Sequence, residues 1–141
     1  MTQYNDPRNG AMKSGSSAAT GAGLLLIAEG TTNTFDLCAD GEIAIAVTAD
    51  EQQRGEDNAI VAGGTVSYYP LGGVVWVQSE ASQTYDLGTI VYVGDGGQCI
   101  DSNDHSSKIL GVYVGDGGAD HTSTTAGVLI PVNTAGAALS R

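Results

Sequence analysis

A seven-residue segment that occurs twice constrains the fold of this chain more than any other feature. Val91-Tyr92-Val93-Gly94-Asp95-Gly96-Gly97 returns unchanged 21 residues later, beginning at Val112. Each copy is a β-branched and aromatic run followed by glycine and aspartate, a pattern typical of a strand that ends in a sharp reversal. The repeat therefore predicts short strands joined by tight turns.

Similar strand signals recur at short intervals from Leu24 onward. We expect strands near residues 24–28, 34–38, 42–48, 59–62, 65–69, 73–78, 88–93, 98–100, 109–114 and 127–132. Gly-Gly and Asp-Gly pairs between these segments allow the positive backbone dihedral angles that tight turns need. Many short strands at such spacing favour an all-β sandwich or barrel.

The order of side chains within these segments predicts their faces. In Ile43-Ala44-Ile45-Ala46-Val47 the larger residues share one face, and the alanines on the other indicate close packing there. In each heptapeptide the tyrosine lies opposite the valines, so we expect Tyr92 and Tyr113 at equivalent places on two strands. The apolar run around Trp76 predicts a central strand, whereas Pro131 marks the last strand as an edge or a terminus.

The first twenty residues differ from the rest. Residues 1–20 show no period of 2 or 3.6, and they include the small, polar run Lys13-Ser14-Gly15-Ser16-Ser17. With Arg8 and Lys13 against Asp6, this segment is mildly basic. We expect an extended N-terminal arm over residues 1–20 and a single β domain over residues 21–141. An arm that orders on a partner and a frayed terminus both remain open.

The charge balance limits the partners. Sixteen acidic residues against five basic ones give a net charge of −11 and an isoelectric point near 4.1. Such a chain repels nucleic acid and anionic membranes, so we expect neither as a partner. A partner with basic patches, a salt-rich host interior and simple solubility of an acidic surface each account for the charge.

Other classes of protein lack their sequence signals. The apolar run Leu24–Ala28 is too short to span a bilayer, and the first residues do not resemble a signal peptide. Cys38 and Cys99 form no CxxC pair and have no histidine at zinc-ligand spacing. Two buried thiols and one disulfide between strands remain alternatives.

Candidate chemistry is weak. The Gly-Asp-Gly-Gly turns lack the lysine and hydroxyl residue of a phosphate loop. Asp101-Ser102-Asn103-Asp104, together with Asp116 and Asp120, offers oxygen ligands that suit calcium, but the glycine and glutamate of an EF-hand are missing. Turn formation is the favoured role of these residues. His105 and His121 lie in polar segments without convergent partners. We predict no catalytic residue, metal or cofactor.

Three segments of the second half follow one another in a suggestive order. They are Leu87-Gly88-Thr89-Ile90-Val91-Tyr92-Val93, Lys108-Ile109-Leu110-Gly111-Val112 and Val128-Leu129-Ile130-Pro131-Val132, with a Gly/Asp turn after the first. Over about residues 85–133 the chain resembles the small capsid decoration, or cement, proteins of tailed viruses. In that family a G-x-x-V-Y-V strand, a K-x-x-G-V strand and a V-x-V strand occur in this order. The glycine-rich composition and the acidic stretch 50–57 depart from the family.

The resemblance implies a small β-barrel or β-tulip-like module with an N-terminal arm, often trimeric, on the outer surface of a viral capsid. It implies the major capsid protein as partner, a homotrimer, and a virion location after synthesis in the host cytoplasm. The arm residues expected to contact the partner are Tyr4, Asn5, Pro7, Arg8, Met12 and Lys13. Removing residues 1–20 should then leave a folded body that no longer binds the capsid.

The expected role is stabilisation of the shell, with no enzymatic activity and no small-molecule substrate. The alternative is a virion spike, fibre or surface-layer domain that binds a host glycan or protein. Tyr68, Tyr69 and Trp76, clustered around a Pro-Leu-Gly-Gly turn, would stack on such a ligand, although core and rim positions are the other explanation for them. A small hydrolase is a third class, for which no site is found.

Overall fold

The computed structural model describes residues 6–14, 18–29, 33–102, 107–115, 121–123 and 125–135. Over these residues the chain forms strands, turns and loops without a helix, which confirms the predicted all-β class. The strands are β1 (Arg8–Ala11), β2 (Leu25–Glu29), β3 (Thr34–Leu37), β4 (Ala46–Thr48), β5 (Thr65–Pro70), β6 (Val74–Ser79), β7 (Gln83–Tyr85), β8 (Ile90–Val93), β9 (Cys99–Ile100), β10 (Ile109–Tyr113), β11 (His121–Ser123) and β12 (Val128–Asn133).

Five strands of the first half form an antiparallel sheet in the order β1-β5-β4-β2-β3, here called the N-terminal sheet. Its two edges approach each other, because the chain after β1 reaches β3. Met12 forms an isolated bridge with Phe35, and the Lys13 N–H donates to the Phe35 carbonyl oxygen at 2.8 Å. The sheet therefore curls toward a ring, which covers backbone groups that an open edge would expose.

Five strands of the second half close completely. This barrel has the order β10-β12-β6-β9-β8, and its strands pair antiparallel except β6 and β9, which meet in parallel at Ser79 and Cys99. The segments that carry the resemblance supply β8, β10 and β12, which are neighbours in the barrel. The short strands β7 and β11 form a separate ribbon. The closed barrel confirms the predicted small β-barrel.

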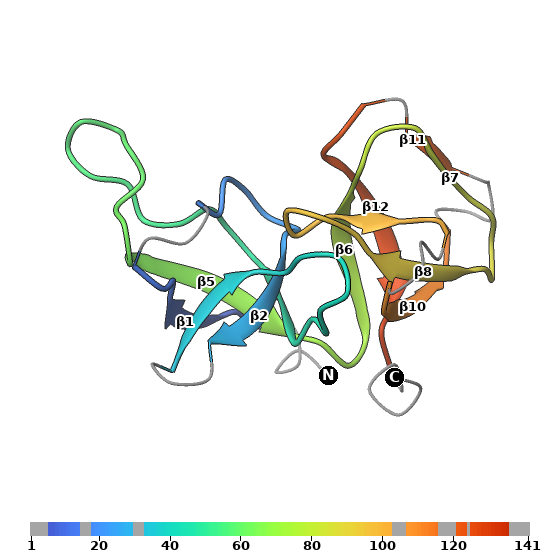
Figure 1. Ribbon diagram of the computed structural model, residues 1–141, viewed down its shortest axis with the longest axis horizontal. Helices are drawn as coiled ribbons and strands as arrows, with labels where there is room; N and C mark the ends of the chain where they lie inside the picture. The colour runs from blue at the N-terminus through green and yellow to red at the C-terminus, as the bar shows by residue number, and fades with distance from the viewer. Residues whose placement is uncertain are drawn as a thin grey trace.

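The N-terminal sheet and the barrel lie side by side (Figure 1). Strand β5 belongs to the sheet and β6 to the barrel, although only Leu71-Gly72-Gly73 separates them in the chain. The turn is fixed from the other end of the chain by Thr134, whose hydroxyl accepts the Gly72 N–H at 2.9 Å and donates to the Gly73 carbonyl at 2.8 Å. The two strands of this connection thus diverge, one into each half.

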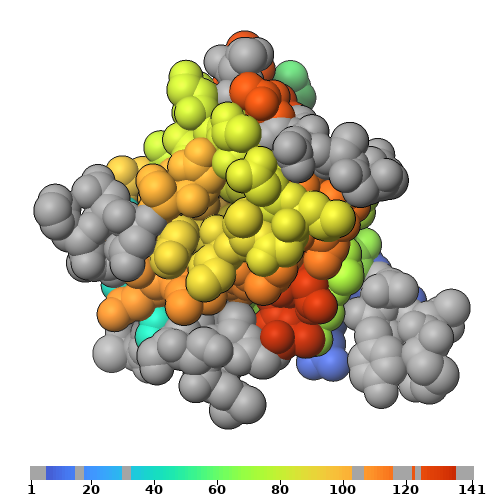
Figure 2. All heavy atoms as spheres, turned by 90° about the vertical axis from the view of Figure 1, so that its right-hand side faces the viewer, coloured from blue at the N-terminus to red at the C-terminus, as the bar shows by residue number. Residues whose placement is uncertain are grey.

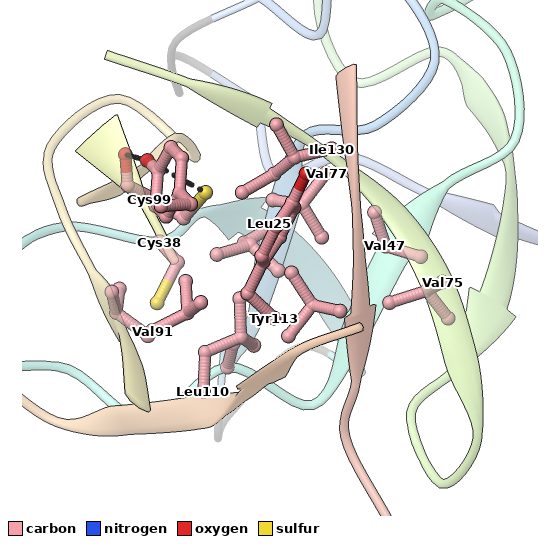
Figure 3. Packing of buried hydrophobic residues seen from close by; sticks show 14 residues of the cluster. Leu25, Cys38, Val47, Val75, Val77, Val91, Cys99, Leu110, Tyr113 and Ile130 are labelled. Carbon is pink, nitrogen blue, oxygen red and sulfur yellow. Dashed lines mark hydrogen bonds between the residues drawn. The ribbon is translucent and has the colours of Figure 1, made fainter. Parts of the chain in front are cut away.

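Consecutive residues of β2 and β4 contribute to two different cores. Leu25 and Val47 belong to a larger core that fills the barrel, whereas Leu26 and Ala46 belong to a smaller core within the N-terminal sheet. Because successive side chains of a strand point to opposite faces, both faces of these strands are covered. Figure 3 shows the larger core, where Leu25 and Val47 pack beside residues of the barrel. The larger core therefore contains residues of both the N-terminal sheet and the barrel.

The segment Ile43-Ala44-Ile45-Ala46-Val47 partly follows its predicted pattern. Ala44 and Ala46 are buried, as expected for a closely packed small-residue face, and Ile43 and Ile45 are exposed. Only Ala46–Thr48 forms a strand, and Val47 is buried together with Ala46. The alternation fails at Val47 because β4 lies between β2 and β5 with a core on each side.

The two copies of the heptapeptide do not take equivalent places, so that prediction is wrong. Val91 and Val93 are buried in the first copy, whereas in the second Val112 is exposed and Tyr113 is buried. The strands pair with Val112 opposite Ile90, beyond an irregularity between Ile109 and Gly111. This register places the second copy in the opposite orientation to the barrel interior.

Two polar strands were not expected from the sequence. Strand β11 pairs with β7 in a ribbon of mostly polar residues that lacks an apolar alternation, and neither segment was among the expected strands. Strand β12, predicted as an edge or terminus because of Pro131, lies between β10 and β6. Pro131 faces β10 just beyond its end, where its carbonyl oxygen accepts the Val114 N–H at 3.2 Å. Its missing N–H therefore removes no bond of the β10 ladder.

The predicted arm needs a correction for the residues that the structure describes. Arg8–Ala11 is strand β1, paired with Thr65–Tyr68 of β5, and Met12 and Ala19 are buried in the smaller core. These residues are part of the N-terminal sheet because their backbone supplies its first strand. Removal of residues 1–20 would therefore open this sheet and its core, contrary to the expectation that the remaining body keeps its fold.

Candidate binding surfaces

The six predicted contact residues near the N-terminus fall into four groups. Pro7 and Arg8 are exposed. Met12 lies in the smaller core, so its side chain offers no surface to a partner, because the bridge to Phe35 turns this part of the chain inward. Tyr4 and Asn5 lie outside the described residues.

Lys13, the remaining predicted contact, is bound within the molecule. Its ammonium group lies 3.4 Å from a carboxylate oxygen of Glu29, and the Lys13 side chain is 45% exposed. An ion pair this open to solvent contributes little to stability. The lysine is thus reachable by a partner, at the modest cost of exchanging one carboxylate for another.

A groove of about 970 Å³ runs between the N-terminal sheet and the barrel where β5 and β6 diverge. Its lining includes Asp6, Arg8, Tyr69, Val74, Trp76 and Leu129. Trp76 is 50% exposed and Val74 is 55% exposed, although both belong to β6, a strand of the closed barrel that pairs with β12 over its whole length. The sequence predicted a central strand here, and the alternation along β6 sends Val75 and Val77 inward while Trp76 faces the groove.

The loop before β2 forms a fixed wall of this groove. The Thr48 hydroxyl donates to the Gly21 carbonyl at 2.7 Å and accepts the Leu24 N–H at 2.9 Å. On the other side, the Gln78 N–H donates to the Gly23 carbonyl at 2.7 Å. Because this wall is bonded to both halves of the molecule, the groove exists before any ligand binds.

The aromatic cluster predicted from the sequence is divided by the structure. Tyr69 and Trp76 line the groove, and Tyr69 also packs against the larger core. Tyr68 instead packs against the smaller core, with its ring centroid 4.7 Å from that of Phe35. Tyr68 and Tyr69 are consecutive residues of one strand, so they point to opposite faces.

A second apolar surface crosses the outside of the barrel. Ile90, Val112, Asn133 and Val74 are successive cross-strand partners on β8, β10, β12 and β6. Ile90, Val112 and Val74 are exposed, and none of the four residues is charged. We call this the outer row. Figure 2 shows the barrel side of the molecule, the right-hand side of Figure 1. The yellow segment around β8 and the orange segments lie together on this surface.

The acidic turns are hydrogen-bonded to segments that are distant in the chain. The Asp95 N–H donates to a carboxylate oxygen of Glu80 at 2.9 Å, and an Asp95 carboxylate oxygen accepts the Asp40 N–H at 3.2 Å. Asp101 accepts the Thr84 N–H at 2.7 Å. In the described part of the chain no group of three or more His, Cys, Asp or Glu side chains is arranged to hold a metal ion. The carboxylates of Asp95 and Asp101 thus tie their turns to the backbone of Asp40 and Thr84, and a bond to the local turn backbone stays a prediction.

A polar cluster lies inside the barrel. The hydroxyl groups of Ser79 and Tyr85 are 2.7 Å apart. The Tyr85 hydroxyl donates to the Cys99 carbonyl oxygen at 3.2 Å and lies 3.5 Å from the Cys99 sulfur, contacts that are dashed beside the labelled Cys99 in Figure 3. Burial raises the pKa of the Cys99 thiol to about 12 and also raises the pKa of Tyr85. Both groups are neutral at pH 7, so this cluster holds no activated nucleophile. Its hydrogen bonds satisfy polar atoms that a dry core would leave unpaired.

Cys38 and Cys99 are both buried, and the structure contains them as thiols and not as a disulfide. This agrees with the first of the two alternatives from the sequence. Of the two histidines, His105 lies outside the described residues, and His121 begins the polar strand β11.

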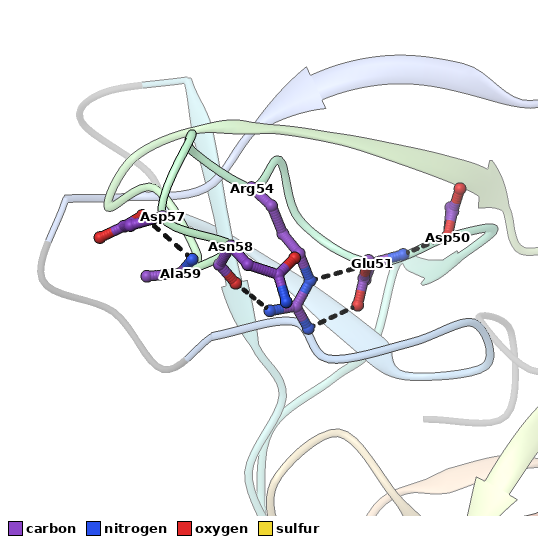
Figure 4. Close-up of polar contacts among 6 residues, drawn as sticks. All are labelled: Asp50, Glu51, Arg54, Asp57, Asn58 and Ala59. Atoms are coloured by element: carbon purple, nitrogen blue, oxygen red, sulfur yellow. Dashed lines mark hydrogen bonds and ion pairs between the residues drawn. The ribbon is translucent and has the colours of Figure 1, made fainter.

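The acidic stretch 50–57 forms a loop that is held by hydrogen bonds of one arginine (Figure 4). The Arg54 guanidinium donates to both carboxylate oxygens of Glu51 at 2.8 Å and to the Asn58 carbonyl at 2.7 Å. The hydrogen bond from Arg54 lowers the pKa of the Glu51 carboxyl. Arg54 is therefore engaged inside the loop, which projects from the N-terminal sheet in Figure 1.

The comparisons identify no relative. No protein-family model matches the sequence, and no curated protein shows significant similarity to it. The described residues contain no helix long and apolar enough to cross a membrane.

Proposed function

We propose that this chain is a capsid decoration, or cement, protein that binds the outer surface of a viral capsid and stabilises the shell. Its partner would be the major capsid protein, and its location the virion, after synthesis in the host cytoplasm. The role is mechanical, with no catalytic step and no small-molecule substrate.

The observation that carries this proposal is the outer row on β8, β10, β12 and β6. Three of its four residues, Ile90, Val112 and Val74, are exposed and apolar. Exposed apolar residues gathered on neighbouring strands mark protein–protein interfaces more often than single exposed side chains do. The row is uncharged in a chain with a net charge of −11, and charged residues are depleted at the centres of interfaces. Three of these four strands, β8, β10 and β12, also carry the sequence resemblance to cement proteins.

The homotrimer in this proposal comes from the resemblance to cement proteins. Three copies around a symmetry axis of a shell would engage it at several points, so the binding of one copy raises the effective concentration of the others. Pro7 and Arg8, exposed beside the groove, are further contacts in this proposal. Tyr4 and Asn5 stay predicted contacts, and Lys13 would exchange Glu29 for a capsid carboxylate.

Introduction of a negative charge into the row by Val112→Asp tests the proposal. A carboxylate at Val112 would be desolvated at the interface, so the variant should lose co-sedimentation with intact virus particles. Ala62→Asp is the matched control, because it adds the same charge at an exposed site of the N-terminal sheet's loop. Equal binding of both variants would argue against the outer row, and a wild-type chain absent from purified particles would refute the proposed function itself.

A further inference from the structure

We propose that the groove between the N-terminal sheet and the barrel binds a neutral oligosaccharide, with a sugar ring stacked on Trp76. This inference goes beyond the proposed shell binding and does not depend on it. A chain that decorates a particle and carries such a groove would also give the particle affinity for glycans.

Trp76 provides the stacking surface. Its strand β6 pairs with β12 over its whole length, with Trp76 opposite Pro131, so the backbone there is held in place. The Trp76 residue itself is 50% exposed and lines the groove. Among the described residues its indole N–H has no hydrogen-bond partner. An aromatic ring with an apolar face and a polar edge suits a pyranose, which has an apolar C–H face and a hydroxylated rim.

Asp6 and Arg8 provide polar contacts in the same groove. Among the described residues neither side chain forms a hydrogen bond or ion pair. Arginine only donates hydrogen bonds, and an ionised aspartate only accepts them. A sugar hydroxyl does both, so this pair of side chains matches neighbouring hydroxyl groups of one ring.

The Gly72-Gly73 turn leaves room for the ligand. A Cβ atom at either position would meet nothing within 4 Å, so the backbone there is open to close approach. Thr134 holds the turn in place through hydrogen bonds to both glycines. A groove of about 970 Å³ whose walls are fixed in advance loses little conformational entropy on binding.

The charges favour a neutral sugar over an acidic one. Asp6 and Arg8 cancel each other within the groove, and the chain as a whole carries −11. A sialic or uronic acid would gain one arginine contact but would approach a strongly acidic molecule. The geometry therefore points to neutral hexoses.

Trp76 is the chain's single tryptophan, so its fluorescence reports directly on the groove. Titration with neutral tetrasaccharides of glucose, galactose and mannose should change the emission saturably for at least one of them, with a Kd on the order of 1 mM or tighter. By calorimetry, Trp76→Ala should weaken binding of that sugar by at least about tenfold. Val112→Ala, an exposed apolar site outside the groove, should leave it unchanged.

A second variant guards against misfolding of Trp76→Ala. Gly73→Leu places a side chain in the open space above the turn and should block the sugar while circular dichroism stays that of the wild type. Three results would overturn the proposal: no response to any neutral sugar, a response only to sialyllactose, or binding that survives both variants. Emission that shifts with protein concentration alone, together with sedimentation as an oligomer, would assign the groove to a second copy and overturn it as well. None of these results bears on particle binding, which is measured separately.

Discussion

The two copies of the heptapeptide have identical sequences and opposite orientations in the barrel. In the copy that starts at Val91, both valines of the strand face the core and Tyr92 is half-buried. In the copy that starts at Val112, that valine is 37% exposed and Tyr113 is only 2% exposed. Inward and outward side chains alternate in both copies. The local sequence thus determines that side chains alternate, but it does not determine which of them face the core.

Strand register explains the difference. Antiparallel partners share a face of the sheet, and β10 pairs with β8 so that Gly111 lies opposite Val91 and Val112 opposite Ile90. A shift of one residue sends every side chain of a strand to the other face. Gly111 suits its place because a Cβ there would collide with the Asn133 carbonyl oxygen of β12.

The turns that follow the two strands also differ in conformation. In the first copy Gly94 carries no positive φ, and Gly96 and Gly97 have φ angles of 63° and 80°. In the second copy the equivalent of Gly94 is Gly115, with a φ of 61°. The same residue type thus serves two purposes: close packing at Gly94 and backbone freedom at Gly115.

The largest expected contrast is between the tyrosines. Tyr113→Ala should lower the free energy of unfolding by about 3–5 kcal/mol, since it empties a large buried site beside Tyr85, whose ring centroid is 5.7 Å away. Tyr92→Ala should cost about 1 kcal/mol, because that side chain is only partly buried. Urea unfolding of both variants measures the difference, and equal losses would contradict the opposite orientations.

The valines should show the reverse order. Val91→Ala removes two buried methyl groups and should lower the free energy of unfolding by about 2 kcal/mol. Val112→Ala changes an exposed site and should stay within about 0.5 kcal/mol of the wild type. The same urea experiment applies, with a larger loss at Val112 than at Val91 as the result that breaks the comparison.

Substitutions by alanine and by asparagine should differ in their relative cost between Gly115 and Gly94. At Gly115 an alanine would occupy the left-handed region at a cost of about 1–2 kcal/mol, and asparagine should cost less because it tolerates this region. At Gly94 a Cβ would collide with the Glu80 carboxylate and lie 2.9 Å from a methyl carbon of Ile100, so the larger asparagine should be worse than alanine. Thermal unfolding of the four variants gives the ranking, and the same order at both positions would show that the two turns are alike.

The smallest effect at neutral pH concerns Cys99, which lies beside the hydroxyl of Tyr85, the ring that packs on Tyr113. Burial raises the pKa of Cys99 from 9.0 to about 12. A thiol with a raised pKa contributes stability that is full below its unfolded value and is lost as pH rises toward its folded value. The stability advantage of the wild type over Cys99→Ala should therefore shrink between pH 9 and pH 12 in urea unfolding. An advantage that is constant over this range would place the thiol in contact with water.

Most of the fold could be predicted from the sequence where alternation or an apolar run was present. Strands β5, β6, β8, β10 and β12 lie within or close to their expected segments. Strand β1 could not be predicted, because Arg-Asn-Gly-Ala has no apolar pattern and becomes a strand only by pairing with β5. The ribbon of β7 and β11 could not be predicted either, because its polar residues also lack an apolar pattern.

The groove was only partly within reach of the sequence. Trp76 and Tyr69 were named as a possible ligand surface, and the period of two along β5 was enough to show that Tyr68 and Tyr69 point apart. Asp6 gave no signal, and Arg8 was expected on an arm and not beside a tryptophan. They line the groove only because β1 joins the N-terminal sheet next to the barrel.

The sequence by itself determined the local features of this protein: short β segments with a period of two, glycine-rich turns and an excess of acidic residues. It contains no recognisable catalytic motif. Tertiary structure decided which side of each segment faces inward, that Arg8–Ala11 complete a sheet, and that this sheet and the barrel meet along an aromatic groove. The reason is physical. Side-chain alternation is a property of a single strand, whereas its phase depends on hydrogen bonds to neighbours distant in sequence.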